Sequence, residues 1–460
     1  MGAATGLLLA HEPILDRNAP RCRGAGLPVR RHKCMLRQYT SVWKQGVQRY
    51  SFMQVARRAL GGNNGWLPAW QSPTLKPSYD AVIIGGGGHG LATAYYLAKK
   101  HGARRVALLE RGWIGGGNSG RNTQVTRSTY FYPVSVNFFD HSLQLYEGLS
   151  HELNFNVMLR QSGQIILAHS QHELEILHRW ANSIRMNGVD AERLSVADIR
   201  RQVPILNTNS RLPIVGGIVQ PRAGISRHDA VVWGFARGAS ALGVDIIQGC
   251  EVTGFRINGG RVVGVETSQG SVSSERVVMS VSNQSSLLAE LAGFTLPITT
   301  MTLQAMVSEP VKPVLDPVVI SAAVHAYVSQ SDRGEIVMGA GADVFNSYRQ
   351  RGTLLNTRAT LAATLELFPC FSRLKLMRQW AGAVDITPDT SPIMGLTPVR
   401  GLYINCGWGT GGFKAIPAGG DTMAYTVAND KPHPLIEAFD LWRFERGALV
   451  DEGAAAGVAH

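Results

Sequence analysis

The sequence is poor in cysteine and lacks the spacings that cysteine chemistry requires. Its 460 residues contain five cysteines and no CxxC pair; they are Cys22, Cys34, Cys250, Cys370 and Cys406. This absence excludes a disulfide framework and a zinc site built from cysteine pairs, and it favours a reducing compartment. We therefore expect no metal site and a cytoplasmic protein.

Long hydrophobic runs are also missing. No apolar run approaches the roughly 20 residues that a membrane-spanning helix needs, so we expect no membrane partner. The hydrophobic content of 45% and the 51 glycines are typical of a soluble α/β enzyme with many tight turns. The length favours two domains.

Negative charge is scarce only at one end of the chain. Residues 1–50 contain nine Lys and Arg against Glu12 and Asp16, so +7 of the net +12 lies there. No nucleic-acid-binding motif accompanies this charge, so we expect no nucleic-acid partner. Residues 1–48 are expected to be a disordered basic leader. They are either an Arg-rich transit peptide or, as we favour, an extension upstream of a true start near Met35 or Met53.

A glycine-rich turn follows a short apolar segment near residue 80. Residues 80–84 (DAVII) predict a buried strand, and residues 91–98 show helical periodicity. The turn between them, GGGGHG, places Gly85, Gly87 and Gly90 in a GxGxxG pattern and also contains Gly88 and His89. This order predicts a dinucleotide site in which the pyrophosphate binds at the start of the helix.

A second strand completes this βαβ unit and ends in an acid. Residues 106–110 (VALLE) end at Glu110, 20 residues after Gly90. An acid at this distance binds the hydroxyl groups of the adenosine ribose. We therefore predict that Glu110 binds the ribose.

Later segments favour FAD over NAD. The small and polar loop 115–123 suits a flavin and contributes Asn118, Arg121, Asn122 and Thr123 to the predicted site. Val252 is expected to contact the adenine through its backbone. Residues 401–406 predict a strand that runs into the turn 407–414, where Gly409, Gly412 and Lys414 are the expected flavin contacts. A nicotinamide-dependent dehydrogenase shares the first βαβ unit, but these two glycine-rich segments count against it.

Eight segments in order resemble the β subunits of heterotetrameric sarcosine oxidases, within the D-amino-acid-oxidase and glycine-oxidase flavoproteins. The resemblance runs from about residue 49 to the last residue, and strings such as GWGTGGFK are highly specific. The segments are residues 85–96, 115–127, 220–231, 243–254, 304–313, 379–392, 402–414 and 451–460.

The resemblance implies two flavins and several subunits. FAD is expected in the Rossmann domain without a covalent bond. FMN is expected at the boundary with an α subunit, attached covalently through His228, and γ and δ subunits complete the heterotetramer. From the residues alone, His228 is better explained as a helix-capping surface residue. His169 is the competing candidate for the flavin bond.

The resemblance also implies sarcosine as the substrate, with its carboxylate held by Arg127 and Lys414. The implied reaction is oxidative demethylation of sarcosine to glycine, with hydride transfer to FAD, electron relay to FMN and reduction of oxygen to hydrogen peroxide. Two alternatives to this interpretation stay open. In the first, the substrate is another N-methyl amino acid such as dimethylglycine. In the second, the chain is a flavin-binding subunit without turnover.

The expected fold is α/β with two domains. A discontinuous Rossmann-like FAD domain is predicted from residues 78–160, 211–292 and 385–445. A substrate domain with a mixed or antiparallel sheet is predicted from residues 161–210 and 293–384.

Three local expectations accompany this fold. Where relatives usually have Ala-Gly-His, this chain has Ser282-Asn283-Gln284, so we expect Asn283 to take the unusual φ of the glycine. His325 and Tyr327 are expected to pack in a strand rather than to line the pocket.

Overall fold

The computed structural model describes residues 52–64 and 68–450. The predicted leader, residues 1–48, lies outside the described residues. So does segment 451–460, the last of the eight segments that resemble the sarcosine oxidase β subunits. The chain divides into two units, residues 1–57 and 58–460. Of the first unit, residues 52–57 are described, and they begin helix α2 (Phe52–Leu60). All that follows concerns the second unit, and no helix among the described residues has the length and apolarity to cross a membrane.

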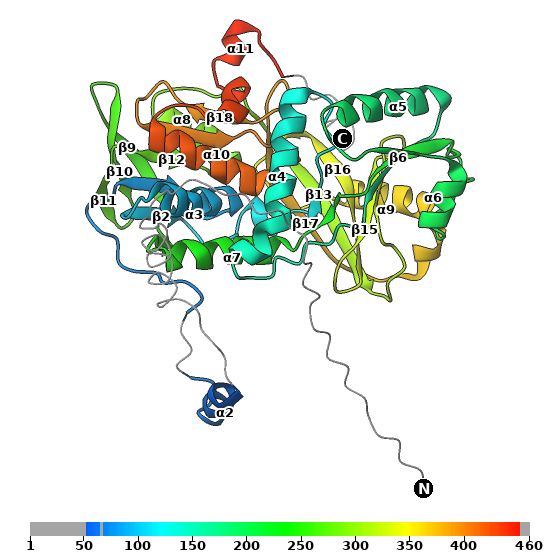
Figure 1. Cartoon of the computed structure of the whole chain (residues 1–460), viewed down its shortest axis with the longest axis horizontal. Helices are drawn as coiled ribbons and strands as arrows, with labels where there is room; N and C mark the ends of the chain where they lie inside the picture. Colours follow the sequence, from blue (N-terminus) through cyan, green and yellow to red (C-terminus); the bar gives the residue numbers. More distant parts are fainter. Residues whose placement is uncertain (1–51, 65–67, 451–460) are drawn as a thin grey trace, which may run out of the picture. The chain divides into compact units, whose positions relative to one another are not determined.

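A six-stranded sheet forms the predicted nucleotide-binding core (Figure 1). Its strands pair in parallel except for the antiparallel edge pair β18–β19. The order is β18 (Ile393–Leu396), β19 (Leu402–Cys406), β12 (Val277–Met279), β1 (Ala81–Ile84), β2 (Val106–Glu110) and β8 (Asp245–Gln248). The strands predicted at residues 80–84 and 106–110 are therefore confirmed, and both are buried on their two faces.

The helices that cover this sheet pack closely against one another because small residues line their contacts. Helix α3 (Gly88–His101) lies against α7 (His228–Ala241) and α10 (Ile416–Asn429). A Cβ built on Gly420 of α10 would lie 2.3 Å from the Cβ of Ala92 on α3, so the two helices cross at backbone distance. The long helix α4 (Pro133–Glu152) packs on α10 and closes the largest core cluster.

A second, eight-stranded sheet carries the rest of the unit. It is antiparallel except for the parallel pair β14–β4. The order is β17 (Leu376–Ile386), β13 (Thr299–Pro310), β16 (Glu335–Asn346), β15 (Ala326–Gln330), β14 (Val318–Ser321), β4 (Gln164–Ala168), β6 (Gly216–Gln220) and β5 (Glu192–Leu194). Of the mixed or antiparallel sheet that we expected, the structure has the mixed form.

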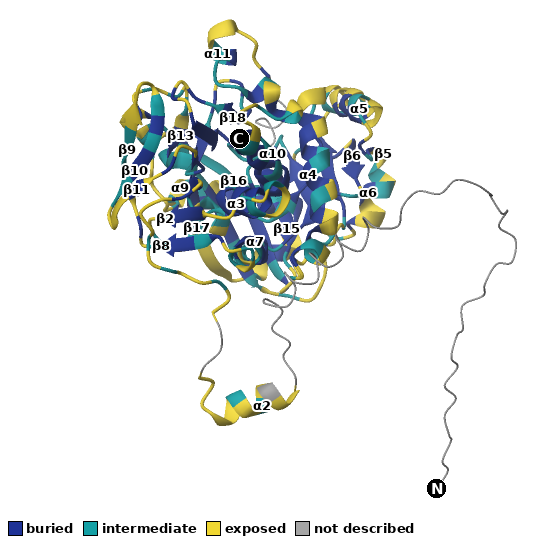
Figure 2. Cartoon of the chain, turned by 60° about the vertical axis from the view of Figure 1, so that its left-hand side comes forward, coloured by how far each residue is buried: buried dark blue, intermediate teal, exposed yellow. Residues whose placement is uncertain are grey.

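Buried side chains concentrate in the two sheets and on the inner faces of the helices that cover them (Figure 2). Strand β6 falls in the segment assigned from sequence to the FAD domain, yet it pairs with β4 and β5 in the eight-stranded sheet. The exact domain boundaries remain a prediction.

Smaller elements complete the unit. The remaining helices are α5 (Gln171–Met186), α6 (Val196–Gln202), α8 (Ser285–Leu291), α9 (Leu354–Leu367) and α11 (Arg443–Arg446). The remaining strands are β3 (Val125–Thr126) and β7 (Gly224–Ile225), which pair together, and β9 (Val252–Asn258), β10 (Arg261–Thr267) and β11 (Gly270–Ser273), which form a three-stranded sheet. Five 3-10 turns are described: η1 (Asn118–Gly120), η2 (Ser282–Gln284), η3 (Pro369–Arg373), η4 (Phe413–Ala415) and η5 (Pro434–Phe439).

A buried ion pair ties the end of the described chain to the core. Arg443 donates to both carboxylate oxygens of Asp389 at 2.8 and 2.9 Å, and both side chains are 1% exposed. Its other hydrogens go to the carbonyls of Ser391, Phe439 and Asp440. All of these partners lose their donor together if the guanidinium is removed.

Arg443→Met should therefore destabilise the protein by about 3–5 kcal/mol, because Asp389 is left buried and unpaired. Denaturant unfolding measures this loss. The control is Arg446→Met at the exposed pair with Asp440, which should cost about 1 kcal/mol or less. Equal effects of the two substitutions would contradict the interpretation.

Candidate functional site

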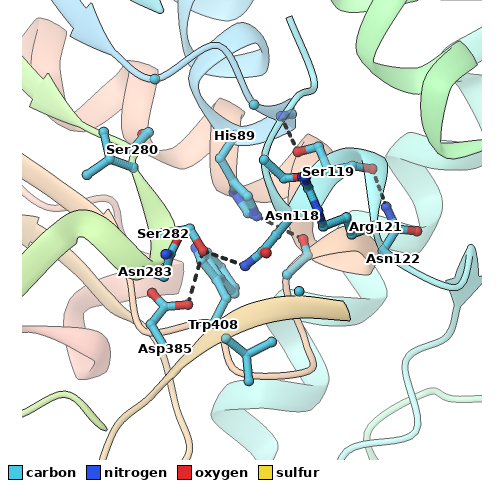
Figure 3. Close-up of a pocket in the computed structure, with 18 of the residues that line it drawn as sticks. His89, Asn118, Ser119, Arg121, Asn122, Ser280, Ser282, Asn283, Asp385 and Trp408 are labelled. Carbon is cyan, nitrogen blue, oxygen red and sulfur yellow. Dashed lines mark hydrogen bonds between the residues drawn. The ribbon is translucent and has the colours of Figure 1, made fainter. Parts of the chain in front are cut away.

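A cavity of about 780 Å³ opens between the glycine-rich turn after β1 and the eight-stranded sheet. Segments far apart in the sequence form its wall: the 85–89 turn, the 116–125 loop, the end of β12 and the 408–414 turn. The eight-stranded sheet contributes Leu303, Ala305, Ile320 and Tyr327. Figure 3 shows the polar side chains that converge in this cavity.

Two glycines allow the turn after β1 to fold this tightly. Gly85 has φ +108°, and a Cβ there would lie 2.3 Å from the carbonyl oxygen of Ser280. A Cβ on Gly90 would lie 2.0 Å from the carbonyl oxygen of Gly85. Both positions exclude any side chain, so the backbone of β1, the start of α3 and the end of β12 meet in direct contact.

Glu110 holds the turn as well as facing the cavity. Its Oε2 accepts a hydrogen bond from the Gly86 amide at 2.7 Å, and its Oε1 accepts from the Gly112 amide at 2.8 Å. Each carboxylate oxygen keeps a second lone pair. The carboxylate can therefore bind two hydroxyl groups while it stabilises the glycine-rich turn.

The 118–123 loop connects the two sheets. Asn118 Nδ2 donates to the Ala383 carbonyl of β17 at 2.6 Å, and Trp380 Nε1 donates to the Arg121 carbonyl at 2.6 Å. Asn122 Nδ2 donates to the Ser119 carbonyl at 2.6 Å. The Oδ1 of Asn118 is buried and has no hydrogen-bond partner among the described residues, so it is available to a ligand.

His89 joins the start of α3 to the second glycine turn. Its ring stacks on Trp408 with 4.5 Å between centroids, and its Nε2 lies 2.8 Å from the Gly412 carbonyl oxygen. Burial lowers the pKa of His89 to about 4, against a smaller opposite effect of the Gly412 carbonyl. The imidazole is therefore neutral at pH 7, and its Nε2–H donates to Gly412.

Arg127 and Lys414 are two buried cations at the same cavity. They are 5% and 8% exposed. Arg127 NH1 donates to the carbonyl and hydroxyl oxygens of Thr129, and Lys414 Nζ donates to the Thr410 carbonyl at 3.2 Å. Neither forms an ion pair with a carboxylate of the described chain. Burial, with the nearby charge of Arg127, holds the pKa of Lys414 well below its ordinary value.

Most of the residues predicted from the sequence lie together on the cavity wall. They are Gly85, Gly87, Gly88, His89, Glu110, Asn118, Arg121, Asn122, Thr123, Arg127, Val252, Gly409, Gly412 and Lys414. Gly90 lies behind the wall, where its role is the close approach to Gly85. His228 does not line the cavity either.

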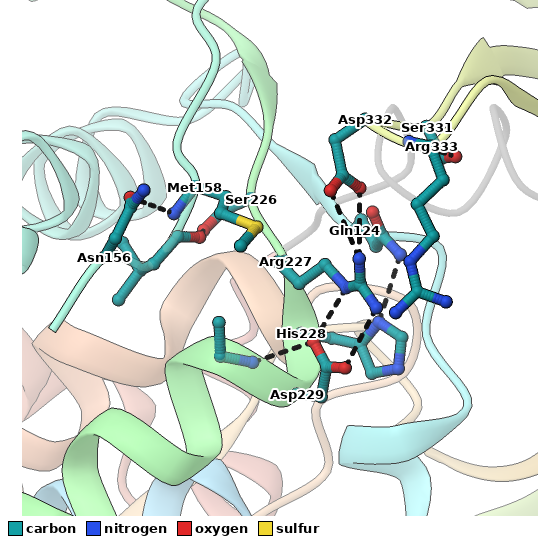
Figure 4. Close-up of polar contacts among 12 residues, drawn as sticks. Gln124, Asn156, Met158, Ser226, Arg227, His228, Asp229, Ser331, Asp332 and Arg333 are labelled. Atoms are coloured by element: carbon teal, nitrogen blue, oxygen red, sulfur yellow. Dashed lines mark hydrogen bonds and ion pairs between the residues drawn. The ribbon is translucent and has the colours of Figure 1, made fainter. Parts of the chain in front are cut away.

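His228 lies one residue layer outside the cavity. Its Nδ1 is 3.2 Å from the side-chain nitrogen of Gln124, and Gln124 itself lines the cavity (Figure 4). The neighbouring Arg227 forms ion pairs with Asp229 and Asp332. His169 differs, because its Nδ1 bonds to the Leu212 carbonyl and its Nε2 to the Ser321 hydroxyl, both at 2.8 Å.

Sequence reasoning missed several residues of the site. Asp385, Ser282 and Trp408 line the cavity, and so does Tyr327, which we expected to pack in a strand away from it. Burial raises the pKa of Tyr327 to about 12, against a smaller opposite effect of its hydrogen bond with Thr123. The signal for Asp385 was an acid near the end of a segment that is apolar from Trp380 to Val384.

The expectation for Asn283 was wrong. Ser282, and not Asn283, takes the left-handed conformation, with φ +50°. The 3-10 turn η2 begins at Ser282, so the chain bends one residue earlier than the comparison with Ala-Gly-His suggests. The hydroxyl of Ser282 bonds to Asn118 and Asp385, which holds this conformation.

The comparisons with known proteins agree with this geometry. The family model described as "FAD dependent oxidoreductase" (DAO) matches residues 80–426. The L-proline dehydrogenase of P. horikoshii superposes with a TM-score of 0.78 at 27% identity, over 82% of this chain and 100% of that one. Glycine oxidase from Geobacillus kaustophilus superposes with a TM-score of 0.73 at 22% identity, over 80% and 99%. Fold and site are those of an FAD-dependent oxidoreductase.

Two curated relatives identify a subgroup within this family. The sarcosine oxidase subunit beta of Rhodobacter capsulatus is 50% identical over 415 residues, 90% of this chain and 100% of that protein. The protein of the same name from Arthrobacter sp. is 50% identical over 85% of this chain and 97% of its own length. The chain belongs to the DAO family and, within it, to the sarcosine oxidase β subunits.

The residues of the cavity fit FAD. The Gly85–Gly90 turn and the start of α3 suit a pyrophosphate, because Gly87 at the helix N-cap has no side chain to cover the helix N-terminus. The Gly88 amide donates to the hydroxyl of Ser119, which itself lines the cavity. Glu110 retains lone pairs for a ribose, and the buried Ser280 Oγ and Asn118 Oδ1 lack partners among the described residues. FAD is therefore the cofactor that this site holds.

Glu110→Ala should raise the dissociation constant of FAD by about tenfold or more, because each hydrogen bond to the carboxylate contributes about 1.5–3 kcal/mol. Glu110→Gln should weaken binding too, since its amide group must face the Gly86 or the Gly112 amide, which are both donors. Flavin fluorescence during titration of flavin-depleted enzyme measures the change. Asp80→Ala, at an exposed acid paired with Arg105, is the control. An FAD affinity of Glu110→Ala equal to that of the control would contradict the assignment of Glu110 to the ribose.

Proposed function

We propose that the chain is the amine-oxidising β subunit of a sarcosine oxidase. It oxidises the N-methyl group of sarcosine to an imine, and water then releases the methyl carbon as formaldehyde and leaves glycine. The observation that carries this proposal is the pair of buried cations, Arg127 and Lys414, on the wall of the FAD cavity. The names of its half-identical relatives support the choice of substrate.

The two cations suit a small amino acid because no carboxylate in the described part of the chain pairs with either of them. Buried positive charges repel each other and cost free energy unless an anion compensates them. The guanidinium of Arg127 is also fixed in place, 4.5 Å from the centre of the Tyr130 ring and bonded to Thr129. A substrate carboxylate between Arg127 and Lys414 would supply the missing charge with fixed donors.

For the rest of the reaction, the role of the protein is to position the substrate. Bound FAD would supply the acceptor for the hydride that leaves the N-methyl carbon. The chain holds the carboxylate and lines the opposite wall with Ile320 and Tyr327, which exclude water. The amine must be neutral to react, and we assign no general base.

The pKa of Lys414 gives this proposal a pH test. Methoxyacetate has the shape and carboxylate of sarcosine but no amine, so its pH dependence reports on the protein. It should bind more weakly as the pH rises through the lowered pKa of Lys414, because the lysine loses its charge. Lys414→Met should weaken binding by about a hundredfold or more at lower pH, as expected for a lost buried ion pair of about 3–5 kcal/mol, and should remove the pH dependence.

The perturbed flavin absorbance on titration measures this affinity. Lys99→Met, at a lysine on α3 that pairs with Glu152 away from the cavity, is the matched control. A Lys414→Met enzyme that binds methoxyacetate like the control would refute the carboxylate site. The rate of anaerobic flavin bleaching by sarcosine, dimethylglycine and L-proline shows which substrate is preferred. Absence of bleaching by all three would indicate a subunit without turnover.

For a second flavin, we propose FMN bound covalently at His228, which relays electrons from FAD to oxygen to give hydrogen peroxide. Three features support it. Nε2 of His228 has no hydrogen-bond partner among the described residues, whereas both ring nitrogens of His169 are bonded. Burial lowers the pKa of His228, more than the carboxylate of Asp229 raises it, so the ring is neutral and nucleophilic. Gln124 touches His228 and lines the FAD cavity, so the two sites are adjacent.

The proposal extends to the assembly. Subunit beta is the name of relatives in a multi-subunit enzyme, and we propose α, γ and δ partners in a heterotetramer that works in the cytoplasm. His228 is only half-buried in this chain, which leaves room for an α subunit to cover the second flavin.

His228→Ala should abolish protein-bound colour after acid precipitation, while FAD still appears in the supernatant. Anaerobic bleaching of FAD by sarcosine should persist, because His228 does not line the FAD cavity. Absorbance of the washed pellet at flavin wavelengths measures the covalent fraction. His169→Ala is the control and should keep the colour. Colour that persists in His228→Ala would exclude this attachment site and leave the FAD assignment intact.

A further inference from the structure

Asp385 is a buried carboxylate with no cationic partner among the described residues. It lies near the end of β17, is 1% exposed and lines the FAD cavity. Its hydrogen bonds come from neutral donors: the Gly407 amide at 2.5 Å, the Trp408 amide, and the Ser282 hydroxyl at 3.3 Å. An unpaired buried carboxylate costs stability, so its place in this fold calls for a reason.

The contacts of Asp385 reach three segments of the cavity wall. The backbone carbonyl of Asp385 accepts from the Gly409 amide at 2.8 Å, so main chain and side chain together hold the turn 407–409. Ser282 begins the turn after β12 and has φ +50°, a conformation that a serine keeps only when its surroundings hold it. Ser282 Oγ also accepts from Asn118 Nδ2 at 2.9 Å, which continues the chain of bonds to the 118–123 loop (Figure 3).

We propose that Asp385 is a positioning residue of the FAD site: its carboxylate holds the 407–409 turn, the Ser282 turn and, through Ser282, the Asn118 loop in the arrangement that binds FAD. Asp385 lies on β17 of the eight-stranded sheet, whereas the 407–409 turn and the Ser282 turn follow β19 and β12 of the six-stranded sheet. The three segments that it holds are more than 100 residues apart in the sequence. No other side chain of the described structure bonds to both Gly407 and Ser282.

If Asp385 has this role, its buried charge lowers the stability of the protein while its hydrogen bonds strengthen FAD binding. Burial raises the pKa of Asp385 from its ordinary 3.8 to about 6, more than its hydrogen bonds lower it. The folded state therefore binds the proton more readily than the unfolded state, and stability falls as the pH rises from about 4 to about 6. Cys406 is the titratable side chain that interacts electrostatically with Asp385, and burial raises its pKa well above its ordinary value.

Asp385→Asn tests the proposal, because asparagine has the same shape without the charge. The flavin-depleted variant should unfold at a higher temperature than the unsubstituted enzyme at pH 7, and the difference should close toward pH 4. The dissociation constant of FAD should nevertheless rise at least tenfold. The amide can accept at one oxygen only, so one of the Gly407, Trp408 and Ser282 donors loses its acceptor.

Asp343→Asn is the matched control, because Asp343 on β16 is also a buried carboxylate (5% exposed), bonds to Asn356 and does not line the cavity. It should leave FAD affinity unchanged. FAD binding within twofold of the unsubstituted enzyme in Asp385→Asn would overturn the proposal. A parallel loss of stability and affinity would also overturn it, since that pattern indicates a merely structural residue.

A second variant keeps the proposal testable if Asp385→Asn does not fold. Ser282→Ala removes the hydroxyl that links Asp385 to Asn118 and leaves both partners in place. FAD affinity should fall severalfold while the unfolding temperature of the flavin-depleted enzyme stays within the range of the Asp343→Asn control. Unchanged FAD affinity in Ser282→Ala would refute the link through Ser282 and with it the proposed role.

Discussion

The FAD site depends on one close approach of backbone segments at the ends of β1 and β12. Gly85 passes the carbonyl of Ser280, and Gly90 passes the carbonyl of Gly85, at distances that leave no room for a Cβ. Because of these contacts, the amide end of α3 faces the carboxyl ends of the parallel strands, where ligands bind in sheets of this kind. Glu110 then fixes the turn from the next strand through the amides of Gly86 and Gly112.

Around this contact the protein retains charges that do not stabilise the fold. Among the residues that the structure describes, Arg127 and Lys414 are buried cations without a carboxylate partner, and Asp385 is a buried carboxylate without a cationic partner. Each such charge lowers the free energy of unfolding as long as it stays uncompensated. All three line the same cavity, which identifies the part of the molecule that is shaped for binding rather than for stability.

The two sheets contribute different parts of the cavity wall. The six-stranded sheet and its helices supply the turns that suit a dinucleotide, while the eight-stranded sheet supplies Tyr327 and Ile320 on the opposite wall. The 118–123 loop bonds to β17 through Asn118 and Arg121 and so keeps the two parts in register. In the proposed function, a substrate between the sheets would therefore meet donors from one side and the side chains of Tyr327 and Ile320 from the other.

The sequence by itself determined the βαβ unit, because strand, glycines, helix and acid occupy one short window whose geometry is local. Gly85, Gly87, Gly90 and Glu110 were found this way, and the string GWGTGGFK placed Lys414 near the flavin site. Only the tertiary structure decided what depends on contacts between distant segments. The Asp385–Ser282–Asn118 chain joins residues from three parts of the chain, and no periodicity reports such a contact. For the same reason the sequence assigned the unusual φ to Asn283 instead of Ser282 and left Tyr327 out of the cavity.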